Sequence, residues 1–130
     1  MGKTKMVEPT DEILPRLKFI RTKRQEYFVC LSLNAAGEII SRRTVTIGTL
    51  NSTFVHPREV FAGPLKDRAA AVIVAHNHPS GISTPSKEDI KTTQQLVAAG
   101  LIMGMPVLDH YIIGKEDHFS FRAHHLIECI

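Results

Sequence analysis

The sequence predicts an α/β domain with a single mixed central β-sheet flanked by helices. Strand-like and helix-like segments alternate along the 130 residues, as is typical of this class. The run of small apolar residues from Ala69 to Ala75 has the composition that a central strand buried on both faces requires. The segment that follows, Ser86 to Ala99, has helical periodicity. These observations favour one sheet with helices packed against it.

The N-terminal segment is predicted to be flexible and to lead into a short helix. Residues 1–10 are polar, and chain ends of this kind are poorly ordered, so we expect one folded domain over residues 11–130. Asp11 to Phe19 is expected to be helical. Pro15 is expected to interrupt that helix, because proline lacks the backbone N–H of a helix interior.

A β-hairpin is predicted next. Tyr27 to Leu33 is rich in β-branched and apolar residues, and Asn34 to Gly37 has the composition of a turn. Glu38 to Ile47 then resumes as a strand, which completes the hairpin. We expect the segment from Gly48 to Phe54 to be irregular.

Proline and glycine mark the helix that precedes the buried strand. His56-Pro57 predicts a helix start, with proline at the first helical position and the Glu59 carboxylate in the first turn. Gly63-Pro64 predicts that this helix breaks and that a second short helical turn follows.

The last third of the chain predicts a helix and two further strands. The helix should begin at Ser86 and end at Gly100, which would supply its C-terminal cap. Its apolar positions are expected near one face: Ile90, Val97, Ala98 and Leu101. Met105 to Ile113 and Phe119 to Phe121 are the remaining strand candidates.

Composition excludes several classes of protein. Apolar residues make up 43% and charged residues 22% of the chain. The chain contains no run of eighteen apolar residues, which is the length that a membrane-spanning helix needs. The N-terminus has no apolar stretch of the secretory type, so a cytoplasmic location is expected. The two cysteines are too few for a disulfide framework. Cys30 is expected to be a small buried hydrophobe, and Cys129 lies near the C-terminus.

Basic residues are concentrated in the early chain, and the net charge is +3. They are Lys3, Lys5, Arg16, Lys18, Arg21, Lys23, Arg24, Arg42 and Arg43. A solvated face explains this cluster, because phosphate binding usually needs a denser basic stripe. Contact with nucleic acid or with an acidic partner is the alternative.

Two histidines at the end of the buried strand are candidate metal ligands. His76 and His78 should project from the same face, because residues i and i+2 of a strand do so, while Asn77 points the opposite way. Catalytic zinc commonly has three protein ligands and an open fourth position. Asp89, in the first turn of the following helix, is the best third ligand.

Ser86 and Asp89 also have an ordinary structural explanation. Serine at the N-cap and a carboxylate three residues later form a capping box. A carboxylate that binds zinc is not free to reach back to a backbone N–H, so the two roles are expected to compete.

The residues from His76 to Asp89 resemble a known metalloprotease signature. His76-x-His78, seven residues and Ser86-x-x-Asp89 match the JAMM (MPN+) pattern H-x-H-x7-S-x2-D. The form HNHPSG…PS..D is similar to the bacterial RadC-like branch of that family. Similar segments extend from about Arg16 to Phe121. Full-length relatives also carry a helix-hairpin-helix segment, so the chain is expected to be a fragment or a short member.

The resemblance implies a JAB/MPN domain of cytidine-deaminase-like architecture that holds one Zn²⁺ per chain on His76, His78 and Asp89. It implies that Glu26 is the general base and that the Ser86 hydroxyl steadies the developing oxyanion. From the residues alone, Glu26 would be a solvated charge. His110 is expected to orient a strand end or a loop, with contact to a metal ligand as the alternative.

Function is therefore expected to be zinc-dependent hydrolysis of a peptide or isopeptide bond in an undefined peptide or protein substrate. The alternative is a non-enzymatic, DNA-associated or scaffold module, since the family name is linked to DNA repair. A nucleoside deaminase would need H-x-E and a distant P-C-x-x-C, which the sequence lacks. No membrane contact is expected, and a homo-oligomer is compatible with the sequence.

Overall fold

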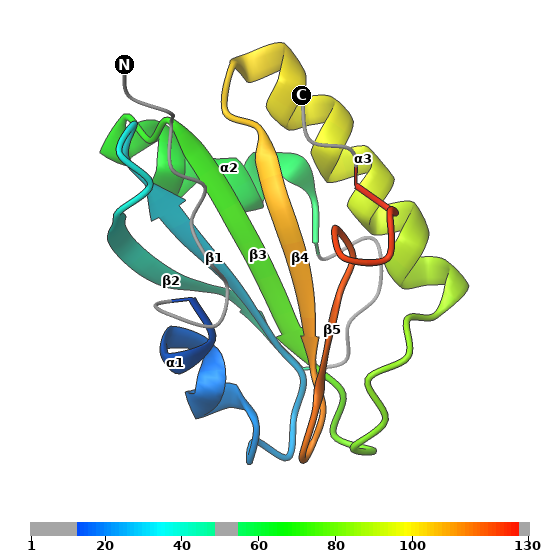
Figure 1. Ribbon diagram of the computed structural model, residues 1–130. Coiled ribbons are helices and arrows are strands. Elements are labelled where there is room, and N and C mark those ends of the chain that lie inside the picture. Colours follow the sequence, from blue (N-terminus) through cyan, green and yellow to red (C-terminus); the bar gives the residue numbers. More distant parts are fainter. Residues whose placement is uncertain (1–12, 49–54, 128–130) are drawn as a thin grey trace.

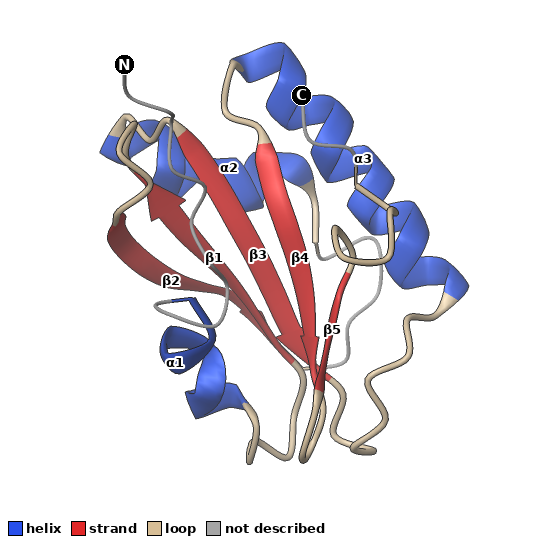
Figure 2. Ribbon diagram, viewed as in Figure 1, coloured by secondary structure: helices blue, strands red, loops and turns tan. Residues whose placement is uncertain are grey.

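The computed structural model describes residues 13–48 and 55–127. Its five strands form one mixed sheet in the order β2-β1-β3-β4-β5, which confirms the predicted α/β class (Figures 1 and 2). The elements in chain order are α1 (Leu14–Leu17) with a 3₁₀ turn (Lys18–Ile20), β1 (Tyr27–Leu33), β2 (Ile39–Ile47), α2 (Pro57–Asp67), β3 (Ala71–Asn77), α3 (Lys87–Met103), β4 (Val107–Ile113) and β5 (His118–Ser120).

Strand directions bring three loops to one end of the molecule. Strand β1 is antiparallel to both β2 and β3, while β3 and β4 are parallel and are connected through α3. His76, near the carboxyl end of β3, therefore pairs with Phe28 at the start of β1 and with Ile112 near the end of β4. The loop before β1, the loop after β3 and the turn between β4 and β5 consequently meet at the lower end in Figure 1.

Two apolar layers sandwich the sheet. On one face, α2 and α3 pack on alternate strand residues, with Phe61, Leu96 and Val74 among the buried side chains. On the other face, α1 and its 3₁₀ turn cover residues such as Leu31 and Ile73. All seven residues of β3 are buried, as predicted for a central strand with both faces covered.

Helix α2 is continuous, so the predicted break at Gly63-Pro64 is wrong. Pro64 lies in the last turn of the helix and is buried, so proline removes at most one backbone hydrogen bond near a natural end. The side chain of Arg43 crosses directly over Gly63 and would contact a Cβ there. Glycine leaves the space that the Arg43 side chain occupies. The helix ends at Asp67 and is capped by Arg68 with φ 55°.

Helix α3 also runs past its predicted end. It continues to Met103 and ends at Gly104, whose φ of 70° suits glycine. Gly100 lies inside the helix. Glycine is needed there because a Cβ would be 2.5 Å from the Met105 carbonyl oxygen. The predicted apolar face is partly wrong: Ala98 and Leu101 are exposed, whereas Ile90 and Val97 pack against the core. The buried positions are Thr92, Thr93, Leu96 and Gly100.

The N-terminal predictions have a mixed outcome. Pro15 does not interrupt the first helix, because it stands at the start of Leu14–Leu17, where no intrahelical N–H is needed. The predictions for residues 1–10, for residues 49–54 and for Cys129 lie outside the described residues. Cys30 is buried as predicted, and burial raises the pKa of its thiol to about 12.

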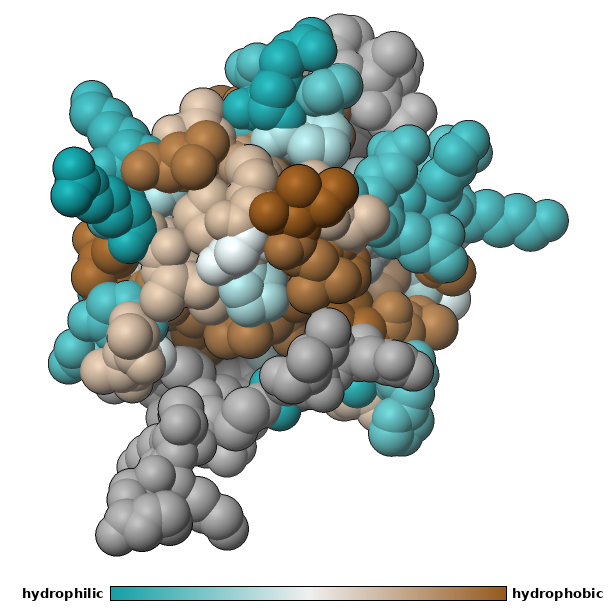
Figure 3. Space-filling view, turned by 90° about the horizontal axis from the view of Figure 1, so that it is seen from above, coloured by the Kyte–Doolittle hydropathy of each residue, from teal (hydrophilic) through white to brown (hydrophobic). Residues whose placement is uncertain are grey.

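The surface carries scattered apolar side chains. Leu65, Leu101 and Ile102, near the C-terminal ends of α2 and α3, are exposed. Figure 3 shows apolar groups among hydrophilic ones on the upper end of the molecule. Within the described ranges, no helix combines the length and the apolar character needed to cross a membrane.

Candidate metal centre

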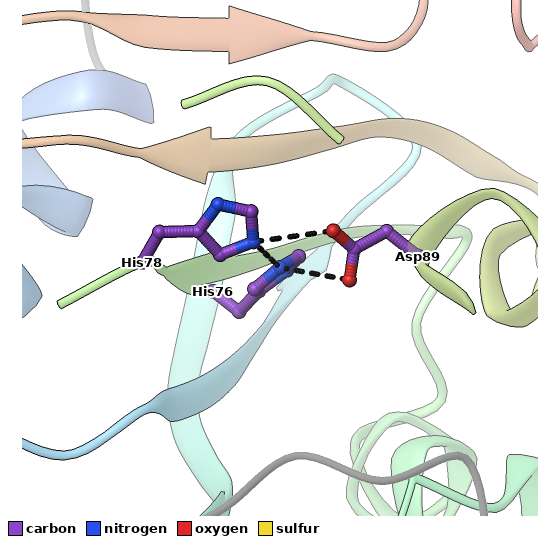
Figure 4. A group of neighbouring side chains, drawn as sticks. All are labelled: His76, His78 and Asp89. Atoms are coloured by element: carbon purple, nitrogen blue, oxygen red, sulfur yellow. Dashed lines mark hydrogen bonds and ion pairs between the residues drawn. The ribbon is translucent and has the colours of Figure 1, made fainter. Parts of the chain in front are cut away.

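The three predicted ligands meet at the carboxyl end of β3. The Nε2 atoms of His76 and His78 are 3.1 Å apart. The two carboxylate oxygens of Asp89, from the first turn of α3, lie 3.3 Å from His76 Nε2 and 3.1 Å from His78 Nε2 (Figure 4). The possible ligand atoms all lie within 4.8 Å of one another, so the group can hold a metal ion.

A backbone carbonyl determines which nitrogen of His78 carries the proton. His78 Nδ1 lies 2.8 Å from the carbonyl oxygen of Ile82. A carbonyl oxygen can only accept a hydrogen bond, so Nδ1 must donate its proton. In the neutral ring, the lone pair is therefore on Nε2, which faces Asp89 and His76.

A longer chain of hydrogen bonds acts in the same way on His76. Thr93 Oγ1 donates to the Asp89 carbonyl oxygen at 2.8 Å, so it can accept from His110 Nδ1 at 2.6 Å. Burial holds the pKa of His110 well below its usual range, so His110 is neutral. His110 Nε2 then accepts from His76 Nδ1 at 2.8 Å. The lone pair of His76 is consequently on Nε2.

The possible ligand atoms of this group require a cation between them. Two imidazole lone pairs and two carboxylate oxygens converge within hydrogen-bonding distance, and they would repel one another unless a metal ion or a proton lay between them. Burial opposes ionisation of Asp89, but hydrogen bonds from His76 and His78, when these rings carry a proton on Nε2, outweigh it and hold the pKa of Asp89 far below its usual range. A metal ion would take the place of those protons. Two neutral imidazoles and an ionised carboxylate fit a divalent metal ion.

Asp89 forms the capping box and also faces both histidines, whereas the competition expected between capping and metal binding stays a prediction. Ser86 Oγ accepts from the Asp89 backbone N–H at 3.0 Å, and Asp89 Oδ2 accepts from the Ser86 N–H at 2.9 Å. A carboxylate has two oxygens and about four acceptor sites, so it can accept the capping bond and still face both histidines. The capping box thereby fixes the orientation of the carboxylate.

Glu26 is close to the centre but does not touch it. It precedes β1, and its carbonyl oxygen accepts from the Gly48 N–H at 2.9 Å. Hydrogen bonding to Asp89 raises the pKa of His78, burial opposes this, and the charge of Glu26 adds a smaller increase. In the described part of the chain, the Glu26 carboxylate makes no hydrogen bond to the three candidate ligands.

Three buried polar residues were not assigned to the site from the sequence. His110 supports a ligand, which is the alternative considered for it, rather than a strand end or loop. Thr93 was missed, although it lies four residues after Asp89 and so on the same helical face. Asn77 was expected only to point away from the histidines, and its contacts are described below.

A mixed α/β sheet that presents two histidines and an aspartate at the end of its central strand corresponds to a JAB/MPN-type domain. A family model described as RadC-like JAB domain matches residues 8–126. The chain therefore belongs to the RadC-like JAB domain family.

Close relatives occur in bacilli. UPF0758 proteins of Bacillus cereus (strain 03BB102), Bacillus anthracis (strain CDC 684 / NRRL 3495) and Bacillus thuringiensis subsp. konkukian (strain 97-27) are each 47% identical to this chain over 114 residues. The match covers 88% of this chain and 51% of each relative. The chain thus spans about half the length of these curated relatives.

Proposed function

We propose that the chain is a zinc-dependent hydrolase of the JAMM type, which cleaves a peptide or isopeptide bond in a peptide or protein substrate. The observation that carries this proposal is the convergence of the Nε2 atoms of His76 and His78 on the Asp89 carboxylate. Three such ligands with an open fourth position are the donor set of catalytic zinc, whereas structural zinc normally has four protein ligands.

The proposed roles are those that the resemblance implies, and the positions of the residues support them. His76, His78 and Asp89 would hold one Zn²⁺, which lowers the pKa of a water molecule to about 7. Glu26 would accept the proton of that water and pass it to the leaving amine. Ser86 Oγ uses a lone pair for the Asp89 N–H, so its own O–H remains available to stabilise a developing oxyanion.

Metal analysis and a cleavage screen test the proposal together. Purified protein should contain about one zinc per chain, on the donor-set argument, and should cleave members of a library of peptides and isopeptide-linked peptides. Cleavage should stop when a chelator removes the metal and should return when zinc is restored. Protein that binds no zinc, or cleavage that a chelator leaves unchanged, would rule out this function.

Zinc affinity should depend on pH through His78. Its pKa is raised mainly by the hydrogen bond to Asp89, and zinc binds only the unprotonated Nε2. Apparent affinity should therefore be constant above this raised pKa and fall by about tenfold per pH unit below it for the one proton displaced. Competition with a chromophoric chelator between about pH 8 and pH 5 would measure it. Affinity that is the same throughout this range would rule out His78 Nε2 as a zinc ligand.

A DNA-associated module is the second candidate function. Exposed basic side chains gather on and beside α1, where Arg16, Lys18 and Arg24 are exposed and Arg42 Nη1 donates to the Arg16 carbonyl oxygen at 3.1 Å. A steep decrease of DNA affinity with salt would favour this candidate. A cytoplasmic location and self-association remain predictions from the sequence.

A further inference from the structure

The middle residue of the His76-Asn77-His78 triplet is also buried, and its side chain makes three hydrogen bonds. Only 1% of Asn77 is exposed. Its side chain leaves β3 on the face opposite to that of His76, because successive strand residues alternate. Asn77 Oδ1 accepts from the Tyr27 N–H at 2.6 Å, and Nδ2 donates to the carbonyl oxygens of Gln25 at 3.0 Å and Lys23 at 3.3 Å.

These three bonds hold one short segment of backbone. The segment is Lys23–Tyr27, which joins the 3₁₀ turn after α1 to the start of β1. Both N–H groups of the Asn77 amide and one lone pair of its oxygen are used. No other residue type of this size supplies two donors and one acceptor in one plane. Loss of the amide would leave two carbonyls and one N–H without their protein partner.

Glu26 lies between the anchored positions. Its two neighbours, Gln25 and Tyr27, are bonded to Asn77 through their backbones, and its own carbonyl oxygen accepts from the Gly48 N–H. The charge of Glu26 already acts on His78 from this position. Because Asn77 is covalently adjacent to both histidines, its amide couples the location of Glu26 to the location of the ligands.

The geometry points to Asn77 as a positioning residue that anchors the Lys23–Tyr27 segment and holds the Glu26 carboxylate at a constant distance from the His76–His78–Asp89 centre. The positioning of Glu26 for catalysis rests on the proposed function, whereas the anchoring of the segment does not. The anchor itself can be measured without metal or substrate. Displacement of a catalytic group by about 1 Å can lower the reaction rate a hundredfold. A rigid connection between Glu26 and the ligands would prevent such a displacement.

Limited trypsinolysis of the metal-free chain tests the anchor. Trypsin cuts after Lys23 and Arg24, and cleavage of a native protein reports local opening. Asn77→Ala should speed cleavage at these two bonds by roughly tenfold or more. It should also raise the hydrogen-exchange rate of the Tyr27 amide. Asn77→Ser serves the same purpose if the alanine variant does not fold.

A matched control is available at the other end of the sheet. Asn34 also makes three hydrogen bonds, to Glu38 Oε1 and to the N–H groups of Ala36 and Glu38, in the turn between β1 and β2. Asn34→Ala should leave cleavage after Lys23 and Arg24 unchanged. Equal cleavage rates in the Asn77 variants and the unmodified chain would overturn the inference.

A spectroscopic measurement tests whether the anchor positions Glu26. With Co²⁺ in place of zinc, the visible spectrum changes with pH, and Glu26→Gln should shift the midpoint of that change. Asn77→Ala should shift the midpoint in the same direction, and the double variant should shift it no further than the larger single effect. An unshifted midpoint in Asn77→Ala alone would overturn the positioning role. An unshifted midpoint in Glu26→Gln would instead refute the base assignment, and the trypsin result would still decide the anchor.

Discussion

Replacement of Glu26 by glutamine should leave about one zinc per chain and reduce turnover by about 10²- to 10⁴-fold. Glutamine has nearly the same shape but cannot accept a proton from water or return it to a leaving amine. The Glu26 carboxylate does not contact the candidate ligands in the described part of the chain. The metal should therefore remain bound while the chemical step is lost. The kcat of zinc-dependent cleavage, with metal content determined on the same sample, would measure the effect.

Glu88→Gln is the matched control for this prediction. Glu88 is the exposed carboxylate immediately before Asp89, in the same first turn of α3. Its replacement removes one negative charge close to the centre without removing a group assigned to the chemistry, so turnover should change by no more than about threefold, as expected for an exposed charge. Equal losses in both variants would mean that Glu26 acts through general electrostatics and not as the base.

Local pattern was sufficient to predict the candidate ligands. The alternation of a strand places His76 and His78 on one face, and the capping signature places Asp89 in a first helical turn. Both rules depend on residues close together in sequence. The same is true of the sheet class and of β3, whose composition alone predicted its burial.

The supporting residues depend on contacts that are distant in sequence. His110 is separated from His76 by 34 positions, and its placement follows from the parallel pairing of β3 and β4, including a register shift between Val72 and Ile73. No periodicity in the sequence specifies that register. Asn77 likewise finds its partners 50 to 54 residues away.

The incorrect helix boundaries have the same cause. Gly63 and Gly100 have the composition of helix ends, but each lies inside a helix at a point where another part of the chain passes close by: the Arg43 side chain at Gly63 and the Met105 carbonyl oxygen at Gly100. The Arg43 side chain comes from β2, where it forms an ion pair with Asp67 of α2. Such close approaches are tertiary contacts, and they override the local preference of glycine for a helix terminus.

Asp89→Ala should lower zinc affinity by a factor on the order of a thousand, if a binding free energy of about 16 kcal/mol is shared among four ligands. The carboxylate is the only charged ligand in the group, and its loss leaves two neutral imidazoles to bind a dication. Competition with a chelator of known affinity would measure the change. Zinc affinity within about tenfold of that of the unmodified chain would show that Asp89 is only a helix cap.

Ser86→Ala separates the ligand role of Asp89 from its capping role. It removes the bond from the Asp89 N–H to Ser86 Oγ but keeps the carboxylate and its bond from the Ser86 N–H. We expect a loss of about 1 kcal/mol in the free energy of unfolding. Zinc affinity should change far less than in Asp89→Ala, because Ser86 only orients the ligand. A similar loss of affinity in both variants would mean that the capping geometry, and not the negative charge, holds the metal in place.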